Sequence, residues 1–581
     1  MHKDELTPHG GDLVARALAR SGVRTLFTLC GGHISPILTA AHTLGLEVTD
    51  VRDEAAAVFA AEALGRLTGT AGVAVLTAGP GLTNGITALQ NARLSHSAIV
   101  VMIGAVPTLL RGRGALQDVD QAAAARPFVK QFTRVERRRD LAPAVTRALC
   151  TAVMGAPGPV VVECPVDVLY PDALVREWYS GMSEPRGSLL QRARHWYVDR
   201  HVGRLLADGG TSGEVARTAG PQGEAPSSRD VGAAAESLRR ATKPVLVLGS
   251  QAARPDVEPT VRAVERLGVP VYLAGSARGL LGREHPLLLR HHRREALHEA
   301  DWVLLAGVPL DFRMGYGRQI PRSATVVAVN LARELLLLNR RPTVRIHAAP
   351  GSLLQALAAQ GAGGTLPAAW LEQLRARDRA REGEIATAAR ERVLPLNPVA
   401  LCRAVDAALP GDACIVVDGG DFVATAAYTV RPPRPLAWLD AGPFGTLGAG
   451  AGYILGAHAT GRFGEIWALF GDGSLGFALS EFHTFVRRRV PLVAVVGNDG
   501  RWAEIGREQE KILGDPVATE LGWTDYHRVV EGFGARGFLL DDPAEVPRVL
   551  AEASRIARAG TPVLINAHIG VSEFRRGAIA M

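Results

Sequence analysis

One stretch of the chain combines a strand, a helix and a second strand, with polar residues at matching ends. Ile466–Phe470 is an apolar run, which predicts a buried strand that ends at a Gly-Asp-Gly turn around Asp472. Apolar residues at helical spacing predict a helix over Phe477–Arg488, and Pro491–Val496 predicts a second buried strand. A right-handed crossover of this length returns Asn498 to the sheet edge where Asp472 lies. The unit therefore predicts a parallel α/β sheet.

The ligand-binding edge of such a sheet is the carboxyl edge, where this unit gathers its polar residues. The Asp472 carboxylate, the Asn498 amide oxygen and the main-chain carbonyl of Gly500 are hard oxygen ligands that suit Mg²⁺. Gly473 and Ser474 stand at the expected start of the helix, where free N–H groups and the positive end of the dipole favour a diphosphate. The spacing therefore predicts a metal and diphosphate site.

This spaced pattern resembles the diphosphate motif of thiamine-diphosphate-dependent enzymes, a Gly-Asp-Gly turn followed later in the chain by Asn-Asn or Asn-Asp. Asn498-Asp499 is the second half of the motif here. The resemblance implies thiamine diphosphate and Mg²⁺ as cofactors. The alternative interpretation is an ordinary crossover turn with a surface aspartate, but the complete motif favours the cofactor.

An acidic residue in the N-terminal part supplies the other half of such a site. Glu54 follows a predicted strand and opens an alanine-rich helix over Glu54–Leu67. Thiamine diphosphate needs a carboxyl beside its pyrimidine nitrogen N1′, and a glutamate in an apolar setting has the raised pKa that this proton sharing requires. A glutamate in the first turn of a helix is also favoured by the dipole alone. Together with the motif at Asp472, we interpret Glu54 as catalytic and cofactor-binding.

The composition limits the partners that such a chain can have. Its net charge is +7, but only four of the 65 basic residues are lysine, and the arginines are spread along the chain rather than gathered in blocks. We therefore expect no nucleic-acid partner, although some arginines could serve a polyanionic ligand. The five cysteines show no C-x-x-C spacing, which favours small buried hydrophobes in a reducing compartment. No membrane-length apolar run and no signal peptide are evident, so a cytoplasmic location is expected.

Alternating strand and helix patterns predict an α/β fold with three doubly wound parallel-sheet domains, which 581 residues accommodate. Eight further strands are predicted, at Thr25–Leu29, Val73–Thr77, Ile99–Ile103, Pro159–Glu163, Pro244–Leu248, Pro270–Leu273, Trp302–Ala306 and Thr325–Val329. The expected divisions are a pyrimidine-binding domain over 8–185, a linker over 186–232, a central Rossmann-like domain over 233–360, a helical connector over 361–395, a diphosphate-binding domain over 396–571 and a tail over 572–581.

The resemblance extends over nearly the whole chain. Several segments are similar to acetohydroxyacid synthase relatives. They are Leu76–Asn84, Gly158–Val168, Phe444–Gly448, Gly471–Gly473 and the pair Arg52 and Glu54. Four segments are more similar to 2-hydroxyacyl-CoA lyases, above all to the acetolactate-synthase-like 2-hydroxyacyl-CoA lyase 2 subgroup. They are Gly31–Pro36, Gly114–Gln121, Leu439–Gly448 and Phe574–Ala580.

This resemblance implies an active site between two chains, with Glu54 from one chain and Asp472 from the other. A homodimer is then the smallest active unit, and a homotetramer is a common form. Gly445 would offer its carbonyl to the aminopyrimidine ring, and Leu447 would be the apolar wedge that holds the cofactor bent. The implied substrates are small molecules, an acyl-CoA or short 2-oxo and 2-hydroxy compounds.

Two further residues bear on the choice of chemistry. His33 lies in a Gly-Gly turn after a predicted strand, and it resembles the histidine of benzaldehyde lyase that assists proton transfer at a substrate hydroxyl. Gln117 is the second candidate, as an amide that holds a substrate oxygen. The structural alternatives are a histidine that satisfies loop carbonyls and a polar residue at a helix start.

The function expected from these residues is cleavage of a 2-hydroxyacyl-CoA to formyl-CoA and an aldehyde one carbon shorter, together with the reverse acyloin-type condensation. His33 would take the hydroxyl proton, while the cofactor supports the carbon–carbon bond cleavage. The main alternative is an acetolactate synthase that condenses pyruvate and carries FAD, and a remote one is a non-catalytic cofactor-binding relative. FAD, an ADP moiety or neither could adjoin Gly249-Ser250 and Gly275–Arg283 in the central domain.

Overall fold

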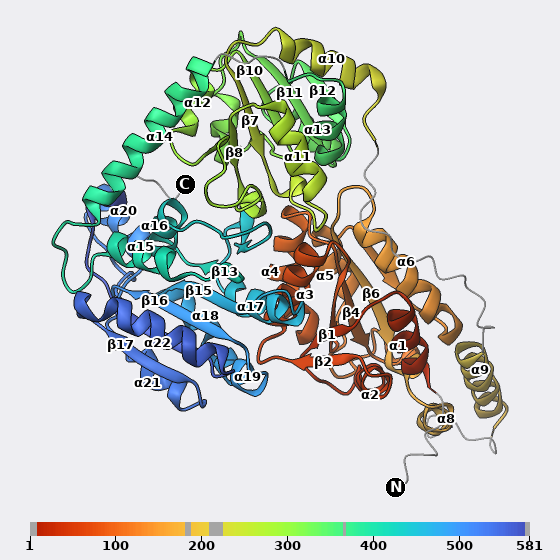
Figure 1. The fold of residues 1–581 in the computed structure, drawn as a ribbon. Coiled ribbons are helices and arrows are strands. Elements are labelled where there is room, and N and C mark those ends of the chain that lie inside the picture. Colours follow the sequence, from red (N-terminus) through yellow and green to blue (C-terminus); the bar gives the residue numbers. More distant parts are fainter. Residues whose placement is uncertain (1–8, 181–187, 208–224, 364–367, 576–581) are drawn as a thin grey trace. The chain divides into compact units, whose positions relative to one another are not determined.

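The computed structural model describes residues 9–180, 188–207, 225–363 and 368–575. These residues form three six-stranded sheets, and every strand pair in them is parallel (Figure 1). Helices flank each sheet, so the predicted α/β fold with three doubly wound domains is confirmed. The chain divides into two compact units, Met1–Pro221 with the first sheet and Gln222–Met581 with the other two.

The first sheet has the order β2-β1-β3-β4-β6-β5. Its strands are β1 Thr25–Thr28, β2 Glu47–Asp50, β3 Gly72–Leu76, β4 Ile99–Ala105, β5 Gln131–Arg134 and β6 Pro159–Pro165. The four of them that were predicted begin within one residue of the expected position. Their runs of Val, Ile and Leu are fully buried, as expected for parallel strands covered on both faces.

Nine α-helices are described in this first unit. They are α1 Gly10–Arg20, α2 Ser35–Thr43, α3 Glu54–Thr68, α4 Pro80–Leu94, α5 Gln121–Ala125, α6 Leu141–Val153, α7 Val166–Leu169, α8 Asp172–Ser180 and α9 Leu189–Leu206. Helix α9 lies within the segment predicted as a linker over 186–232. Its Val198, Val202 and Leu205 are buried in the hydrophobic core of the first sheet. Residues 208–224 of that linker lie outside the described residues.

The central sheet has the order β12-β11-β10-β7-β8-β9, the strand arrangement of dinucleotide-binding doubly wound folds. Its strands are β7 Pro244–Leu248, β8 Val271–Leu273, β9 Leu288–Leu289, β10 Trp302–Ala306, β11 Thr325–Asn330 and β12 Val344–His347. The accompanying helices are α10 Ser228–Arg239, α11 Glu258–Leu267, α12 Arg293–Glu299, α13 Pro350–Ala359 and α14 Ala368–Ala388. Helix α14 lies in the segment predicted as a helical connector.

The third sheet has the order β14-β13-β15-β16-β18-β17, which repeats the connectivity of the first sheet strand for strand. Its strands are β13 Ala413–Asp418, β14 Trp438–Leu439, β15 Glu465–Gly471, β16 Leu492–Asn498, β17 Arg536–Leu540 and β18 Val563–His568. The helices are α15 Pro398–Ala408, α16 Asp421–Thr429, α17 Ala449–Ala459, α18 Asp472–Ala478, α19 Phe482–Arg487, α20 Ala503–Leu513, α21 Tyr526–Glu531 and α22 Val546–Arg558.

The helix predicted over Phe477–Arg488 begins earlier and is interrupted. Strand β15 continues to Gly471, α18 starts directly at Asp472, and a short 3₁₀ turn over Leu479–Glu481 separates α18 from α19. No connecting turn therefore lies between the strand and the helix, so Asp472 itself is in the first turn. Among the described helices, none is both long and apolar enough to cross a bilayer.

Candidate active site

Strand register places Asp472 and Asn498 at the same edge, as the sequence spacing predicts: β15 and β16 are parallel neighbours, and Gly471 is paired with Gly497. Both polar side chains are buried, with exposures of 3% for Asp472 and 0% for Asn498. The Asp472 Oδ1 atom accepts a hydrogen bond of 2.8 Å from the N–H of Gly473. Within the described residues, the buried Oδ2 atom has no hydrogen-bond partner, and burial raises the pKa of this carboxyl. A buried carboxylate oxygen without a partner fits the position of a cation ligand.

The amide of Asn498 is held in one orientation. Its Nδ2 atom donates to Asn566 Oδ1 at 3.0 Å, which leaves Oδ1 to accept from the N–H of Gly500 at 3.1 Å. The carbonyl of Gly500, the third candidate metal ligand, already accepts hydrogen bonds of 2.7 and 2.9 Å from the N–H groups of Leu521 and Gly522. Asp472 and Asn498 therefore fit a hard cation better than Gly500 does in this conformation.

The first turn of α18 is closely packed against its surroundings. A methyl group on Gly473 would lie 2.4 Å from ring carbons of Trp502, so only glycine fits beneath this ring. Trp502 thus covers the first turn of α18. The Ser474 hydroxyl donates to the main-chain carbonyl of Asp418 at 2.5 Å or of Gly471 at 3.0 Å. The N–H groups of a first helical turn are suited to an anion, although that of Gly473 here already donates to Asp472 Oδ1.

A second loop of the same unit carries Gly445 and Leu447. It connects β14 to α17, and Gly445 has the left-handed φ of +66° at the end of a short 3₁₀ turn. Gly445 is exposed and Leu447 is half-buried, so a carbonyl and an apolar side chain are both available to a ligand.

Glu54 is the first residue of α3 in the other compact unit, and it is buried with 7% exposure. The helix cap is supplied by Asp53, whose carboxylate accepts from the N–H of Ala55 at 2.7 Å. Glu54 is therefore not needed as the cap. Its Oε2 atom accepts a hydrogen bond of 3.0 Å from Asn84 Nδ2, a partner in α4 that the sequence interpretation missed.

The side chain of Gln121 links two glycines that pack against His33 and Gln117. The buried Gln121 side chain donates to the carbonyl of Gly104 at 3.0 Å and accepts from the N–H of Gly79 at 2.9 Å. A methyl group on Gly104 would lie 2.4 Å from His33 Cβ, and one on Gly79 would lie 3.0 Å from Gln117 Cβ. Gln121 thus holds the backbone against which His33 and Gln117 pack. The sequence did not indicate this burial, because a polar residue at a helix start is usually exposed.

The His33 ring is half-buried, and its Nδ1 atom lies 3.4 Å from the Thr77 hydroxyl. Burial lowers the pKa of His33 below the ordinary value for histidine. The imidazole is consequently neutral near pH 7 and able to accept a proton. Gln117 has a left-handed φ of +65°, an uncommon backbone conformation for a residue other than glycine.

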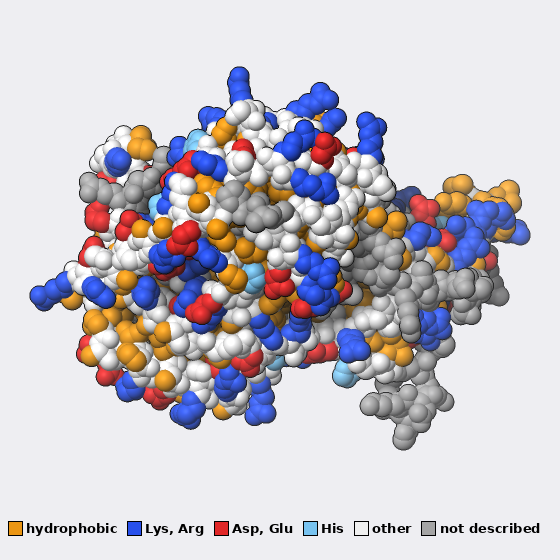
Figure 2. All heavy atoms as spheres, turned by 45° about the horizontal axis from the view of Figure 1, so that its top comes forward, with side chains coloured by type: hydrophobic (Ala, Val, Ile, Leu, Met, Phe, Trp, Pro, Cys, Tyr) orange, Lys and Arg blue, Asp and Glu red, His pale blue; other side chains and the backbone are white. Residues whose placement is uncertain are grey.

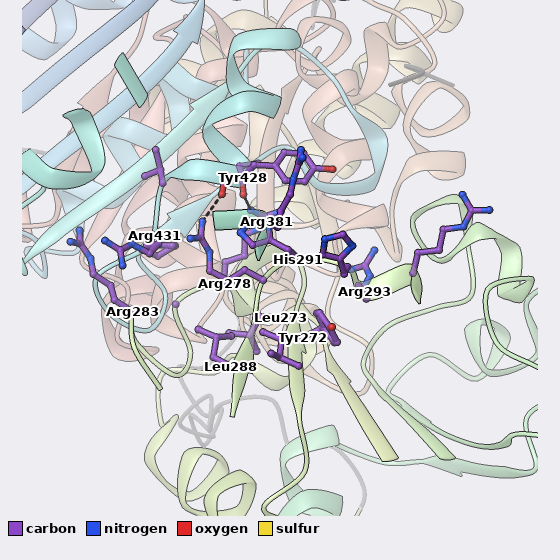
Figure 3. Close-up of a pocket in the computed structure, with 18 of the residues that line it drawn as sticks. Tyr272, Leu273, Arg278, Arg283, Leu288, His291, Arg293, Arg381, Tyr428 and Arg431 are labelled. Atoms are coloured by element: carbon purple, nitrogen blue, oxygen red, sulfur yellow. Dashed lines mark hydrogen bonds between the residues drawn. The ribbon is translucent and has the colours of Figure 1, made fainter. Parts of the chain in front are cut away.

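Arginines on the face drawn in Figure 2 are mixed with acidic residues instead of forming one basic patch. They gather instead around a cavity of about 490 Å³ in the second unit (Figure 3). The lining comes from the segment between Tyr272 and Glu295, from Arg381 and from Ala427–Pro432. Three of these arginines are paired, because Arg290 contacts Glu382 at 2.7 Å, Arg431 contacts Asp406 at 2.8 Å and Arg381 contacts Glu384 at 2.6 Å.

The other four arginines of this pocket, among them Arg278, Arg283 and Arg293, have no carboxylate partner among the described residues. In the described parts of the chain, no acidic side chain lies within salt-bridge distance of Arg278, Arg283 or Arg293. The Nε and one terminal nitrogen of Arg283 are buried without a hydrogen-bond partner. Burial lowers the pKa of Arg278 and of Arg293. Arg278 donates to the carbonyl of Ala427 and Arg293 to the carbonyl of Arg313, each at 2.8 Å. Guanidinium groups that lack a carboxylate partner in a partly closed cavity are suited to an anionic ligand, above all to phosphate groups.

Comparisons with known proteins agree with the motifs. Models of thiamine pyrophosphate enzymes match in three parts: the N-terminal TPP binding domain at residues 8–124, the central domain at 231–357 and the C-terminal TPP binding domain at 418–567. Thiamine diphosphate binding follows from these domains.

Relatives of similar length match along the whole chain. The proteins named 2-hydroxyacyl-CoA lyase 2 from Bos taurus and Homo sapiens are each 46% identical, over 100% and 99% of this chain and 93% and 92% of their own lengths. The acetolactate synthase large subunit IlvG of Mycobacterium tuberculosis is 34% identical, over 96% of this chain and 95% of its own. The resemblance inferred from the motifs is confirmed. The chain belongs to the thiamine pyrophosphate enzymes, in the group that contains the 2-hydroxyacyl-CoA lyase 2 proteins.

Proposed function

We propose that this protein is a thiamine-diphosphate-dependent carbon–carbon lyase that cleaves a 2-hydroxyacyl-CoA to formyl-CoA and an aldehyde one carbon shorter, and that also catalyses the reverse condensation. The observation that carries the proposal is the arginine pocket, in which Arg278, Arg283 and Arg293 have no carboxylate partner among the described residues. Coenzyme A brings several phosphate charges that such a pocket would bind, whereas pyruvate brings none. The relatives named 2-hydroxyacyl-CoA lyase 2 support the same substrate class.

The residues at the third sheet would hold the cofactor and its metal. Asp472 Oδ2 and the amide oxygen of Asn498 would bind Mg²⁺. The carbonyl of Gly500 would be a third ligand if it gave up one of its two hydrogen bonds to Leu521 and Gly522. The N–H groups at Gly473 and Ser474 would bind the diphosphate. When bound, thiamine diphosphate supplies the electron sink for carbon–carbon bond cleavage.

Other residues would orient the aminopyrimidine ring and move protons. Glu54 would hydrogen-bond the ring nitrogen, Gly445 would accept from the exocyclic amine, and Leu447 would keep the two rings of the cofactor bent. His33 would accept the proton of the substrate hydroxyl as the carbon–carbon bond opens, and Gln117 would hold a substrate oxygen. Because Glu54 and Asp472 come from different compact units, a homodimer with sites shared between chains suits the proposal, and pairing into a homotetramer is compatible with it.

We also propose a cytoplasmic location.

An alternative ligand of the second unit is a separately bound ADP or FAD. The packing around Gln251, shortly after β7, argues against a nucleotide at the edge of the central sheet. The Gln251 side chain donates to Asn330 Oδ1 at 2.9 Å and accepts from the N–H of Leu331 at 2.9 Å. A methyl group on Gly249 would lie 2.4 Å from the Gly307 carbonyl, so this edge is closely packed. We therefore favour the phosphates of the substrate as the ligand of the arginine pocket.

A direct assay tests the function. Purified protein with thiamine diphosphate and Mg²⁺ is incubated with 2-hydroxyacyl-CoA esters of several chain lengths, and aldehyde and formyl-CoA are followed by mass spectrometry. A parallel reaction contains pyruvate and is assayed for acetolactate. Formation of both lyase products supports the proposal. Acetolactate formation without aldehyde from any ester would establish the synthase alternative, which the 34% identity to an acetolactate synthase keeps open.

The arginine pocket gives a prediction about substrate binding. Arg283→Gln should raise KM for a 2-hydroxyacyl-CoA about tenfold or more, because a charge-assisted contact to phosphate is lost, while thiamine diphosphate affinity stays unchanged. Arg266→Gln, on the exposed end of α11, is the matched control and should leave KM unchanged. Competition by ADP, FAD and free coenzyme A in the wild-type protein identifies which phosphate compound the pocket selects.

The lowered pKa of His33 gives a prediction about pH. A base that must be neutral loses activity on the acid side, so kcat/KM should fall as pH drops through a pKa below about 6.5. His33→Ala should reduce the rate about 10²-fold or more and remove this acid limb. Thiamine diphosphate affinity should scarcely change. A pH profile that is identical in the wild-type protein and the variant would show that another group accepts the proton.

A further inference from the structure

Asp418, the last residue of β13, contacts both of the segments proposed to hold the cofactor. Its side chain is buried, with 4% exposure. One carboxylate oxygen accepts a hydrogen bond from the N–H of Gly450 at 2.8 Å, and the other accepts from the N–H of Gly448 at 3.3 Å. These two N–H groups follow directly on the loop that carries Leu447.

The main chain of Asp418 contacts the other segment. Its carbonyl accepts the 2.5 Å hydrogen bond from the hydroxyl of Ser474, in the first turn of α18. The next residue, Gly419, has a φ of +148°, and a methyl group there would lie 2.8 Å from the Gly471 nitrogen. The end of β13 is thus packed directly against the diphosphate turn, and one residue joins the two loops.

Stabilisation of the fold does not explain why the carboxylate of Asp418 is buried. In the described part of the chain, no Lys, Arg or His lies within salt-bridge distance of Asp418, and burial raises its pKa to about 7. Because the folded-state pKa is raised, ionisation of this group opposes folding at pH values above the unfolded pKa. A serine or asparagine would cap the start of α17 without that cost. A buried charge kept at the expense of stability is characteristic of functional sites.

We infer that Asp418 is a positioning residue of the cofactor site, which holds the loop of Gly445 and Leu447 in register with the turn of Asp472 to Ser474. The bent cofactor must touch both segments at once, the aminopyrimidine ring at the loop and the diphosphate at the turn. A carboxylate accepts from two neighbouring N–H groups and so fixes the loop in both position and orientation. The inference rests on the cofactor part of the proposed function and is independent of the substrate.

Two substitutions test the role of Asp418. Asp418→Asn keeps one acceptor and presents an amide group to the second N–H, so the dissociation constant for thiamine diphosphate at saturating Mg²⁺ should rise about tenfold. Asp418→Ala removes both acceptors and should raise it about 10²-fold. In the holoenzyme, the exchange of the cofactor C2 proton, measured by NMR at saturating cofactor, should also slow in both variants, because a displaced loop misplaces the aminopyrimidine ring.

Asp412→Asn is the matched control, because Asp412 precedes the opposite end of the same strand, where it pairs with Arg558 at 3.0 Å. It should change neither the dissociation constant nor the exchange rate. If Asp418→Ala does not fold, Asp418→Asn alone decides. Cofactor affinity and C2 exchange within twofold of wild type in Asp418→Asn would overturn the inference, whatever happens to its thermal stability. Neither measurement uses an acyl-CoA, so an absence of lyase activity would leave this test unaffected.

Discussion

Glu54→Gln should bind thiamine diphosphate normally and lose turnover by a factor of about 10² to 10⁴. The glutamine keeps the shape of the side chain and can still accept the hydrogen bond from Asn84, which is 3.0 Å long in the wild type. It cannot share a proton with the pyrimidine nitrogen. Cofactor affinity is measured by titration in the presence of Mg²⁺, turnover by the aldehyde and formyl-CoA assay, and activation of the cofactor by C2 proton exchange.

Asp53→Asn is the control for this variant. Asp53 caps α3 by accepting from the N–H of Ala55, and asparagine caps a helix about as well as aspartate. The control should therefore retain both cofactor affinity and turnover. If Glu54→Gln turns over at a rate close to that of Asp53→Asn, the catalytic assignment of Glu54 is wrong and its buried carboxylate serves only the contact with α4.

Asp472→Ala should abolish retention of thiamine diphosphate and leave the fold intact. Among the described residues, Oδ2 of this residue is buried without a hydrogen-bond partner, and burial raises its pKa. Removing the carboxylate therefore removes an unfavourable buried charge, and the apo variant should unfold at the same temperature as wild type or higher. The rise in melting temperature that thiamine diphosphate and Mg²⁺ cause in the wild type should vanish, because binding to the native state is its source.

Asp542→Ala provides the comparison, since Asp542 is an exposed cap in the same sheet domain whose carboxylate accepts from the N–H of Ala544 at 2.9 Å. It should keep the full ligand-dependent rise in melting temperature. Normal cofactor binding by Asp472→Ala, unaffected by a chelator, would disprove the metal assignment. A variant that fails to fold without cofactor would instead assign Asp472 a structural role.

Sequence predicted the buried parallel strands best, because their continuous apolar runs leave few alternatives. Pro244–Leu248 and Trp302–Ala306 have the predicted bounds. The strand expected before Glu54 was predicted without bounds, since the edge strand β2, Glu47–Asp50, is polar and only one of its four residues is buried. Helix α9 was missed for a related reason: its few buried residues are separated by charged ones, and only the packed core shows their common face.

The neighbouring positions of candidate residues were predictable where a motif of fixed spacing carries them. Asp472 and Asn498 lie at one sheet edge as predicted, because one crossover sets their separation. The arginine pocket was not predictable, since its cations come from segments more than a hundred residues apart and single arginines carry no spacing signal. Gln121 and Asp418 were missed as well. Each acts on the backbone of glycines far along the chain, and such contacts exist only after folding.

The identical connectivity of the first and third sheets has a consequence for the origin of the site. Six strands in the same order, joined in the same way, indicate that one ancestral domain was duplicated and the copies then diverged. Glu54 lies in the crossover after the second strand of the first copy, where the proposed function gives it the contact to the pyrimidine ring. Asp472 lies in the crossover after the third strand of the other copy, where the proposed function gives it the metal. With these roles, duplication would have let a carboxyl that shares a proton and a carboxylate that binds a cation be selected separately on one scaffold.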